Sequence, residues 1–133
     1  MRIYKPGERI TLKIDEIEFV VSPLTFPEKS EILTKMGKAS ALKDPQEAFK
    51  TNFETLRYAI KDVNGFEDED GKPWRPSFDE DGRLSWESLD VLLNMSVTEP
   101  VMNHIASFLQ GIPRGLPDGV FLVEKKKETT NSP

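Results

Sequence analysis

The residues best suited to chemistry are two acidic segments in the middle of the chain, which form a twelve-residue near-repeat. Residues 66–74 and residues 78–86 each run from Phe to Trp and contain an Asp-Gly pair after several carboxylates. An EF-hand calcium loop needs acidic ligands at positions one, three and five, Gly at six and Glu at twelve. Placing either glycine at position six puts a serine, Ser77 or Ser88, at position twelve. The pattern therefore predicts two Asp-Gly turns and no metal site.

The candidates for catalysis lack partners. His104 is the only histidine, and no second histidine, cysteine or serine motif accompanies it to position a general base. The carboxylates of residues 67–70 and 79–81 stand in runs beside glycine and charged residues, which is typical of solvated loops. An acid and base pair would need one carboxyl in an apolar pocket. We therefore expect no catalytic residues, no cofactor and no enzymatic activity.

Composition predicts one soluble domain. The chain has 133 residues, of which 37% are apolar and 31% charged, with a net charge of -5 and no cysteine. We expect a single globular domain over residues 1–123 and a flexible charged tail over residues 124–133, which has nothing to bury. The N-terminus lacks the apolar stretch of a signal peptide, and no run approaches the ~18 apolar residues of a membrane span. The acidic balance disfavours nucleic acid as a partner.

The first elements are a β-hairpin and a capped helix. Apolar residues alternate through residues 9–22, which predicts two antiparallel strands around Asp15-Glu16. Because Asp-Glu is not a favoured two-residue turn, we expect a longer or bulged loop. Thr25 and Glu28 form a capping box that starts a helix ending near Gly37, followed by a polar loop over residues 38–43.

The strongest helix start is Asp44-Pro45, with Glu at the third position. From it a continuous apolar stripe predicts a helix that reaches Asn64-Gly65. A short helix should follow Ser85, a fourth should begin at Thr98-Glu99-Pro100 and end at Gly111, and residues 120–123 should form a short strand. The predicted fold is α+β, mainly helical, with about four helices. The members of the stripe are Phe49, Phe53, Leu56, Ile60 and Val63.

Two kinds of apolar side chain suit either a core or a partner. Trp74 and Trp86 follow equivalent turns, and we favour packing against the helices over a role as binding anchors. Met36, Met95 and Met102 suit an adaptable surface for a helical client, although methionine on helices more often fills a core.

Three short motifs and the order of the parts carry a family resemblance. Ser-Pro-Leu-Thr at residues 22–25 introduces the first helix, Asp-Val-Asn-Gly-Phe stands at residues 62–66, and Asp-Gly-Lys-Pro-Trp at residues 70–74 precedes a leucine-rich helix. In this order the chain resembles the tail assembly chaperones of long-tailed bacteriophages. The resemblance extends over residues 10–111, in pattern and motif order more than in identities.

The resemblance implies a non-enzymatic chaperone in the host cytoplasm. Members of that family bind and solubilise the tape-measure protein and help to recruit tail-tube subunits during virion morphogenesis. An apolar groove for such a client is expected between the second and fourth helices, although the same residues suit a core equally well. Self-association is compatible with this function. The predicted partner-binding residues are Phe49, Phe53, Met102 and Phe108.

Other functions fit the same residues. A structural phage tail or head-tail connector subunit would form oligomeric rings through the edge of the hairpin. A bacterial adaptor or inhibitor domain without a viral connection is a further alternative. The chaperone remains the first prediction because the motif order supports it.

Overall fold

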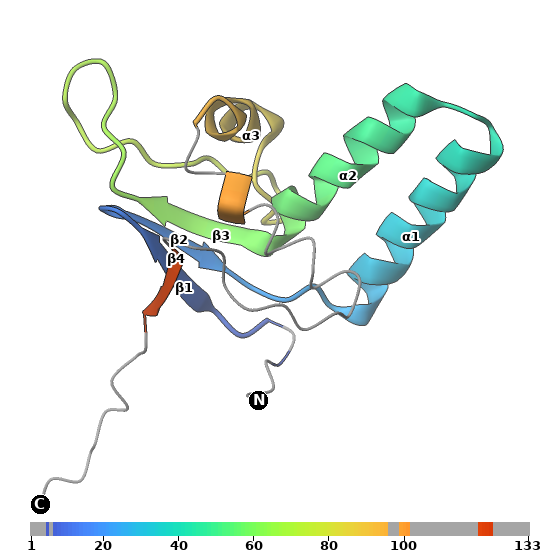
Figure 1. The fold of residues 1–133 in the computed structure, drawn as a ribbon, viewed down its shortest axis with the longest axis horizontal. Helices are drawn as coiled ribbons and strands as arrows, with labels where there is room; N and C mark the ends of the chain where they lie inside the picture. Colours follow the sequence, from blue (N-terminus) through green and yellow to red (C-terminus); the bar gives the residue numbers. More distant parts are fainter. Residues whose placement is uncertain (1–4, 6, 96–98, 102–119, 124–133) are drawn as a thin grey trace, which may run out of the picture.

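The structure is a computed structural model, which describes residues 5, 7–95, 99–101 and 120–123. The described residues form an antiparallel sheet with helices packed on one face, so the predicted α+β class is confirmed (Figure 1). Residues 99–101 are helical, as expected for the start of a fourth helix, while its remainder and the predicted tail at residues 124–133 lie outside the described residues. The elements are β1 (Ile10–Ile14), β2 (Ile17–Val21), α1 (Phe26–Ala41), α2 (Pro45–Ala59), β3 (Ile60–Asn64), α3 (Trp86–Leu93) and β4 (Val120–Val123).

The hairpin of β1 and β2 forms with a tighter turn than predicted. Ile14 pairs directly with Ile17, so the loop is the two residues Asp15 and Glu16. Asp15 has a φ of 51°, a left-handed conformation that aspartate adopts more readily than most residues. The expectation of a longer or bulged loop was therefore wrong, because Asp15 takes the positive φ for which glycine or asparagine is usually chosen.

The first helix begins as predicted and ends later. The Thr25 side chain accepts from the Glu28 amide, and the Glu28 carboxylate accepts from the Thr25 amide, which completes the capping box. The helix passes through Gly37 and continues to Ala41, into residues predicted as a polar loop. Burial of Ala39, at 5% exposure, supplies packing beyond Gly37 that offsets the weak helix preference of glycine.

The second helix stops four residues before Val63, the last residue of the apolar stripe that predicted it. α2 ends at Ala59, and the chain continues without a linker into β3, whose Ile60 and Val63 pair with Val21 and Phe19 of β2. Val21 pairs with Ile60, whereas its neighbour Val20 pairs with Asp62, two residues further along β3. The residue between Ile60 and Asp62 is therefore an extra one, which forms a bulge in β3. The bulge lets two side chains three positions apart point to the same face. The prediction of one long helix was wrong because a bulged strand satisfies the same spacing.

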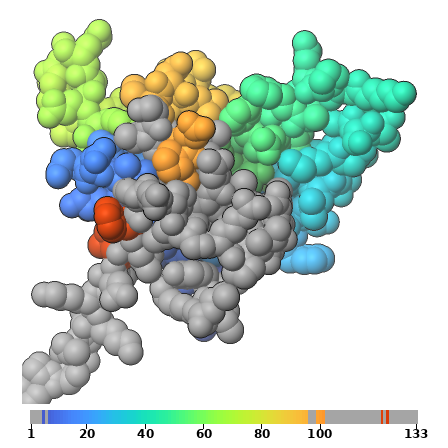
Figure 2. Space-filling view, in the orientation of Figure 1, coloured from blue at the N-terminus to red at the C-terminus, as the bar shows by residue number. Residues whose placement is uncertain are grey.

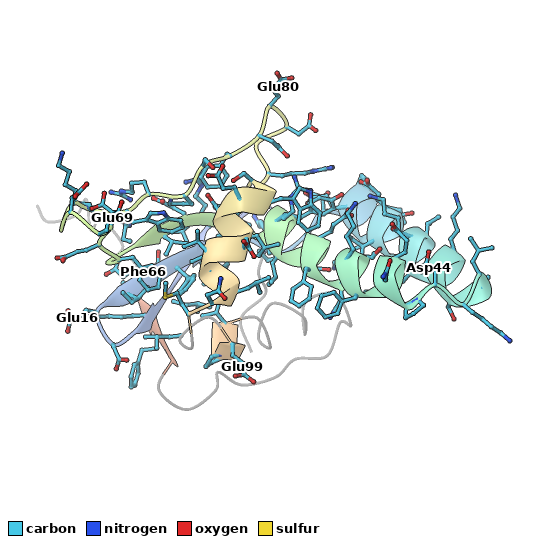
Figure 3. The ribbon with its side chains drawn as sticks, turned by 90° about the horizontal axis from the view of Figure 1, so that it is seen from above. Glu16, Asp44, Phe66, Glu69, Glu80 and Glu99 are labelled. Atoms are coloured by element: carbon cyan, nitrogen blue, oxygen red, sulfur yellow. The ribbon has the colours of Figure 1, made fainter. Side chains whose placement is uncertain are left out.

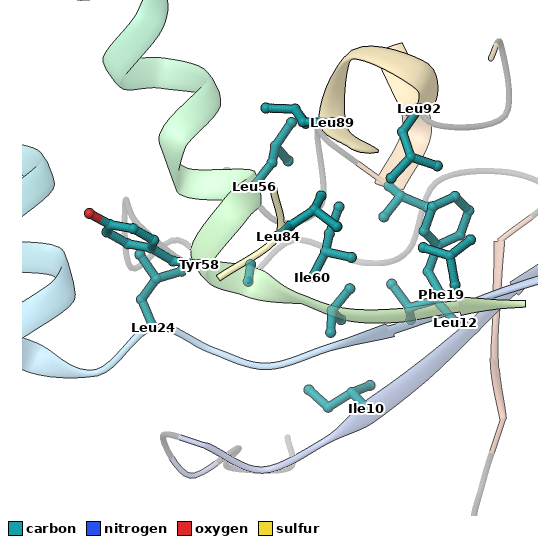
Figure 4. Packing of buried hydrophobic residues seen from close by; sticks show 14 of the residues in the cluster. Ile10, Leu12, Phe19, Leu24, Leu56, Tyr58, Ile60, Leu84, Leu89 and Leu92 are labelled. Atoms are coloured by element: carbon teal, nitrogen blue, oxygen red, sulfur yellow. The ribbon is translucent and has the colours of Figure 1, made fainter. Parts of the chain in front are cut away.

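The core lies between one face of the sheet and the helices. Leu56, Leu84, Leu89 and Leu92 cover the strands that carry Leu12, Phe19 and Ile60 (Figure 4). α3 follows its N-cap Ser85, as predicted, and the Ser85 hydroxyl accepts from the Ser88 amide. The helix buries Leu89 and Leu92. β4 extends the sheet beside β1, which confirms the predicted short strand and gives the strand order β3-β2-β1-β4.

Residues 66–85, called the acidic segment, form two turns of the same construction. In each, one aspartate carboxylate, Asp68 or Asp79, accepts from the amides two and four residues later, and its own amide donates to the carbonyl of the fourth residue. Gly71 and Gly82 take positive φ angles of 74° and 76° in these turns. The predicted turns are confirmed, although their structural period is eleven residues, from Asp68 to Asp79, where the Phe and Trp positions suggested twelve.

The two turns differ in how they are attached. Arg57 of α2 donates to Asp79 at 2.6 Å and to the Leu84 carbonyl at 2.7 Å, and its guanidinium lies 4.5 Å from the centre of the Trp86 ring. The second turn is thus bonded to α2. Glu69 and Glu80, at the outer ends of the two turns, point away from the body of the protein (Figure 3).

Replacing Gly65 by alanine should destabilise the protein strongly. Gly65 has a φ of 110°, and a Cβ there would lie 2.4 Å from the carbonyl oxygen of Glu16 in the hairpin turn. We expect the free energy of unfolding to fall by at least about 2 kcal/mol, from backbone strain and the clash together. Urea unfolding followed by circular dichroism measures it. Gly71→Ala is the control, since nothing lies within 4 Å of its Cβ position; equal losses would contradict the close approach.

Asp79→Ala should cost more stability than Asp68→Ala. Both remove the carboxylate that accepts two turn amides, which is worth about 1 kcal/mol. Asp79→Ala also leaves Arg57, whose side chain is 11% exposed, without its carboxylate, so its total loss should be about 2 to 3 kcal/mol. Equal losses in urea unfolding would show that the Arg57 ion pair contributes nothing.

Candidate protein-binding surface

α1 and α2 form a projecting arm. The two helices lie antiparallel and extend away from the sheet, and residues 26–59 are called the helical arm below (Figure 1). The arm and the acidic segment project from different parts of the molecule (Figure 2). Large apolar side chains on the arm are exposed to solvent, with exposed fractions of 81% for Phe26, 55% for Leu33, 78% for Leu42 and 67% for Phe49.

The outer face of α1 carries an apolar stripe that faces away from the core. Phe26 and Leu33 are seven residues apart, so they lie on one side of the helix, with Ser30 and Gly37 on the same side. The buried residues Ile32 and Ala39 occupy another side. α1 therefore has a face for the core and a second face with no apolar partner among the described residues.

A shallow open groove runs along α1 beside this stripe. Its apolar end is formed by Phe26 and Pro27, and charged side chains lie further along the helix. An apolar helix with a few polar groups matches such a mixed surface better than a small ligand does. The lining residues are Phe26, Pro27, Ser30, Glu31, Thr34, Lys35 and Lys38.

Only half of the predicted partner-binding residues lie in the described part of the chain. Phe49 and Phe53 of α2 form an edge-to-face pair with ring centres 4.6 Å apart. Phe49 is exposed, whereas Phe53 packs against the core. Met102 and Phe108 lie outside the described residues. The predicted groove between the second and fourth helices therefore stays a prediction.

The sequence prediction did not include Phe26, Leu33 or Leu42. The spacing of Phe26 and Leu33 was a usable signal, since both fall outside the stripe formed by Ile32, Met36 and Ala39. Leu42 follows the last helical residue, where an apolar side chain has no periodic pattern to interpret. Exposure depends on which face packs, which periodicity alone does not decide.

The tryptophans and methionines divide between core and surface. Trp74 packs against the core with Phe66, as favoured, at a ring-centre distance of 6.1 Å. Trp86 is 39% exposed and lies beside the cations of Arg57 and Lys50. Met36 packs against the core and Met95 is 39% exposed, while Met102 lies outside the described residues.

A charged network joins the arm to the second acidic turn. Lys35 of α1 donates to Glu54 of α2 at 2.9 Å and lies 3.3 Å from Glu31, which in turn lies 3.4 Å from Arg83. The Arg83 guanidinium stacks 4.0 Å from the centre of the buried Tyr58 ring. The network links α1 to α2 and to the second acidic turn.

The network shifts three pKa values. The hydrogen bond to Glu54 raises the pKa of Lys35. Burial disfavours the charged form of Glu31, but hydrogen bonds from Lys35 and Tyr58 outweigh it, so the pKa of this carboxyl is lowered. Burial raises the pKa of Tyr58, opposed by the charge of Arg83. Glu31 and Lys35 are therefore charged near neutral pH and hold the arm together.

Known proteins give no further guidance. Comparison of the chain with protein-family models, with curated proteins and with solved structures finds no match. Within the described residues, no group of three or more acidic, histidine or cysteine side chains is placed to hold a metal ion. In the same part of the chain, no helix combines the length and apolar character that crossing a membrane requires.

Glu31→Gln should reduce the pH dependence of stability on the acid side. Because the folded-state pKa of Glu31 lies below its ordinary value of 4.5, its contribution is present above pH 4.5 and is lost as the pH falls through the folded pKa. The wild type should exceed the variant slightly in unfolding free energy at pH 7, since Glu31 is 39% exposed, and this difference should shrink as the pH falls below 4.5. Glu69→Gln controls for the lost charge; a difference that does not shrink on acidification would contradict the assignment.

Proposed function

We propose that this protein is a non-enzymatic assembly chaperone whose helical arm binds apolar helical segments of a client protein. One observation carries the proposal: four large apolar side chains of the arm are more than half exposed, although the chain has a buried core available for such residues. Exposed apolar surface on a soluble protein is typical of interaction sites.

The physical basis is helix-in-groove binding. A client helix laid along α1 would bury Phe26 and Leu33 from solvent, and full burial of each such side chain contributes ~1.5–3 kcal/mol before the costs of association. Glu31, Lys35 and Lys38 line the groove beside this stripe and supply polar contacts there. The net charge of -5 keeps a complex with an aggregation-prone client soluble.

The proposed client follows from the family resemblance. Tail assembly chaperones of long-tailed bacteriophages act on the tape-measure protein, a long helical protein that aggregates when it is alone, and help to bring tail-tube subunits to it. We infer the same clients for this chain, in the cytoplasm of the host. Phe49 and Phe53 of α2 remain proposed contacts, and so do Met102 and Phe108, which lie outside the described residues.

The alternative of a ring-forming connector subunit loses its expected interface. That prediction used the edge of the β1–β2 hairpin, yet β3 pairs with the free side of β2 and β4 pairs with the free side of β1. A ring would need a surface other than the hairpin edge. On the arm, the exposed side chains of Phe26, Leu33 and Phe49 lie on helices, which favours a helical client over a partner that adds a strand.

Co-expression tests the function. The chain should be produced together with the large helical protein encoded beside it, and client solubility and co-purification should be scored. A soluble complex supports the chaperone. An insoluble client with no complex, while this chain remains folded, would contradict it.

Charge on the arm should abolish client binding without unfolding the chain. Phe26→Glu and Phe49→Glu replace side chains that are 81% and 67% exposed, so unfolding free energies should change by less than about 1 kcal/mol. Client binding should weaken by about tenfold or more for each, because a charge would be buried in the complex. Val91→Glu, at a 37% exposed site on α3, is the control away from the arm, and its folding is checked by circular dichroism. Binding lost in the control, or retained in both arm variants, would exclude the arm.

A further inference from the structure

The two edges of the sheet are built differently. At the β3 edge, Asp62 and Asn64 are held by Arg75, whose guanidinium contacts both side chains. At the β4 edge, Phe121 is 65% exposed and Val123 is 39% exposed. Among the described strands, only β1 pairs with β4, so one side of β4 has no strand partner there.

β4 is a short edge strand of four residues, but it lacks the other devices that keep edge strands from pairing. Natural edge strands are often very short, or carry charges, proline or bulges that block the approach of another strand. β3 has a bulge and charged residues, whereas β4 reads Val-Phe-Leu-Val without charge, proline or irregular register. The main chain of β4 is therefore a template for a further strand.

On the outer face of the sheet, two rows of side chains that cross the paired strands end at β4. Phe121 lies opposite Lys13, which pairs with Glu18, and Val123 lies opposite Thr11. Because side chains alternate along a strand, Phe121 and Val123 lie on the same face. Both rows thus finish in an exposed apolar side chain at the open edge.

We propose that β4 pairs antiparallel with β4 of a second copy of this chain, which makes one continuous sheet of eight strands around a twofold axis at Leu122. A twofold axis perpendicular to the sheet keeps each side chain on its own face. Opposite residues are then Phe121 of one copy and Val123 of the other, and the pair occurs twice. The contact is closed, so assembly stops at two copies.

The self-complementary edge favours a second copy as the occupant, and the distribution of charge permits it. The chain carries a net charge of -5, which opposes self-association at most surfaces. The acidic segment follows β3, at the sheet edge away from β4, and β4 itself is uncharged. The acidic segments of the two copies are therefore separated where the strands meet. The contact between the two β4 strands is also self-complementary, because Phe121 of each copy covers Val123 of the other.

Sedimentation of the full chain across a concentration series tests the dimer. The wild type should show a concentration-dependent dimer, and Phe121→Glu should raise the dissociation constant by about tenfold or more. Lys13 lies opposite the new carboxylate, so the fold should be retained, which circular dichroism checks. Phe49→Glu, at a phenylalanine of similar exposure on the arm, should leave the dimer unchanged.

Cross-linking tests the register. The chain contains no cysteine, so single cysteines introduced as Phe121→Cys and Val123→Cys can form disulfides only between copies. A mixture of the two variants should give a disulfide-linked dimer, whereas each variant alone should not. A monomer at all concentrations, a dimer unaffected by Phe121→Glu, or a dimer lost in Phe49→Glu would overturn the proposal. A dimer that forms through β4 only when the client is present would also overturn the proposal. Client binding is scored separately with Phe49→Glu, so either proposal can fail alone.

Discussion

The pairing of β3 with β2 is the constraint on which the rest of the structure depends. α2 runs into β3 without a linker, and the Ser22 amide donates to the Ala59 carbonyl at 2.8 Å beside that junction. The arm is therefore bonded to the sheet at its base. The bulge in β3 turns both Ile60 and Val63 into the core, and Gly65 then closes against the hairpin turn. The direction of the arm and the start of the acidic segment both follow from this junction.

The acidic segment connects β3 to α3, and Asp79 bonds its second turn to Arg57 of α2. Two of its carboxylates hold the turns, and Asp79 also neutralises Arg57, while Glu69 and Glu80 face solvent. Cations face inward instead: Arg57 lies beside Trp86 and Arg83 beside Tyr58. This arrangement explains why a calcium-like spacing exists without the ligand set for calcium. The aspartates are placed to bind main-chain amides.

Local signals in the sequence predicted most elements and failed where long-range pairing decided the outcome. The caps at Thr25, Asp44 and Ser85, the alternation of the hairpin and the Asp-Gly turns depend on neighbouring residues, and all formed as predicted. Ile60 and Val63 suited a helix by spacing, but β2 supplied main-chain partners that a single-sequence pattern does not reveal. For the candidate site, periodicity led to the prediction of Phe49, which is exposed, whereas the exposure of Phe26 and Leu33 depends on how α1 packs.

The proposed dimer would hold its two arms far apart on one continuous sheet, which suits a long client. The arm joins the sheet through β2 and β3, while the proposed dimer forms at β4, on the other side of β1. The two β3 strands of a dimer would be seven strand spacings apart, about 34 Å. A helix of ~23 residues covers this distance. A dimer would therefore offer two arms to one extended helical client, and binding at the first arm would raise the effective concentration of the client at the second. Weak apolar contacts on each arm would then suffice for stable capture, which fits arms that expose only a few large apolar side chains apiece.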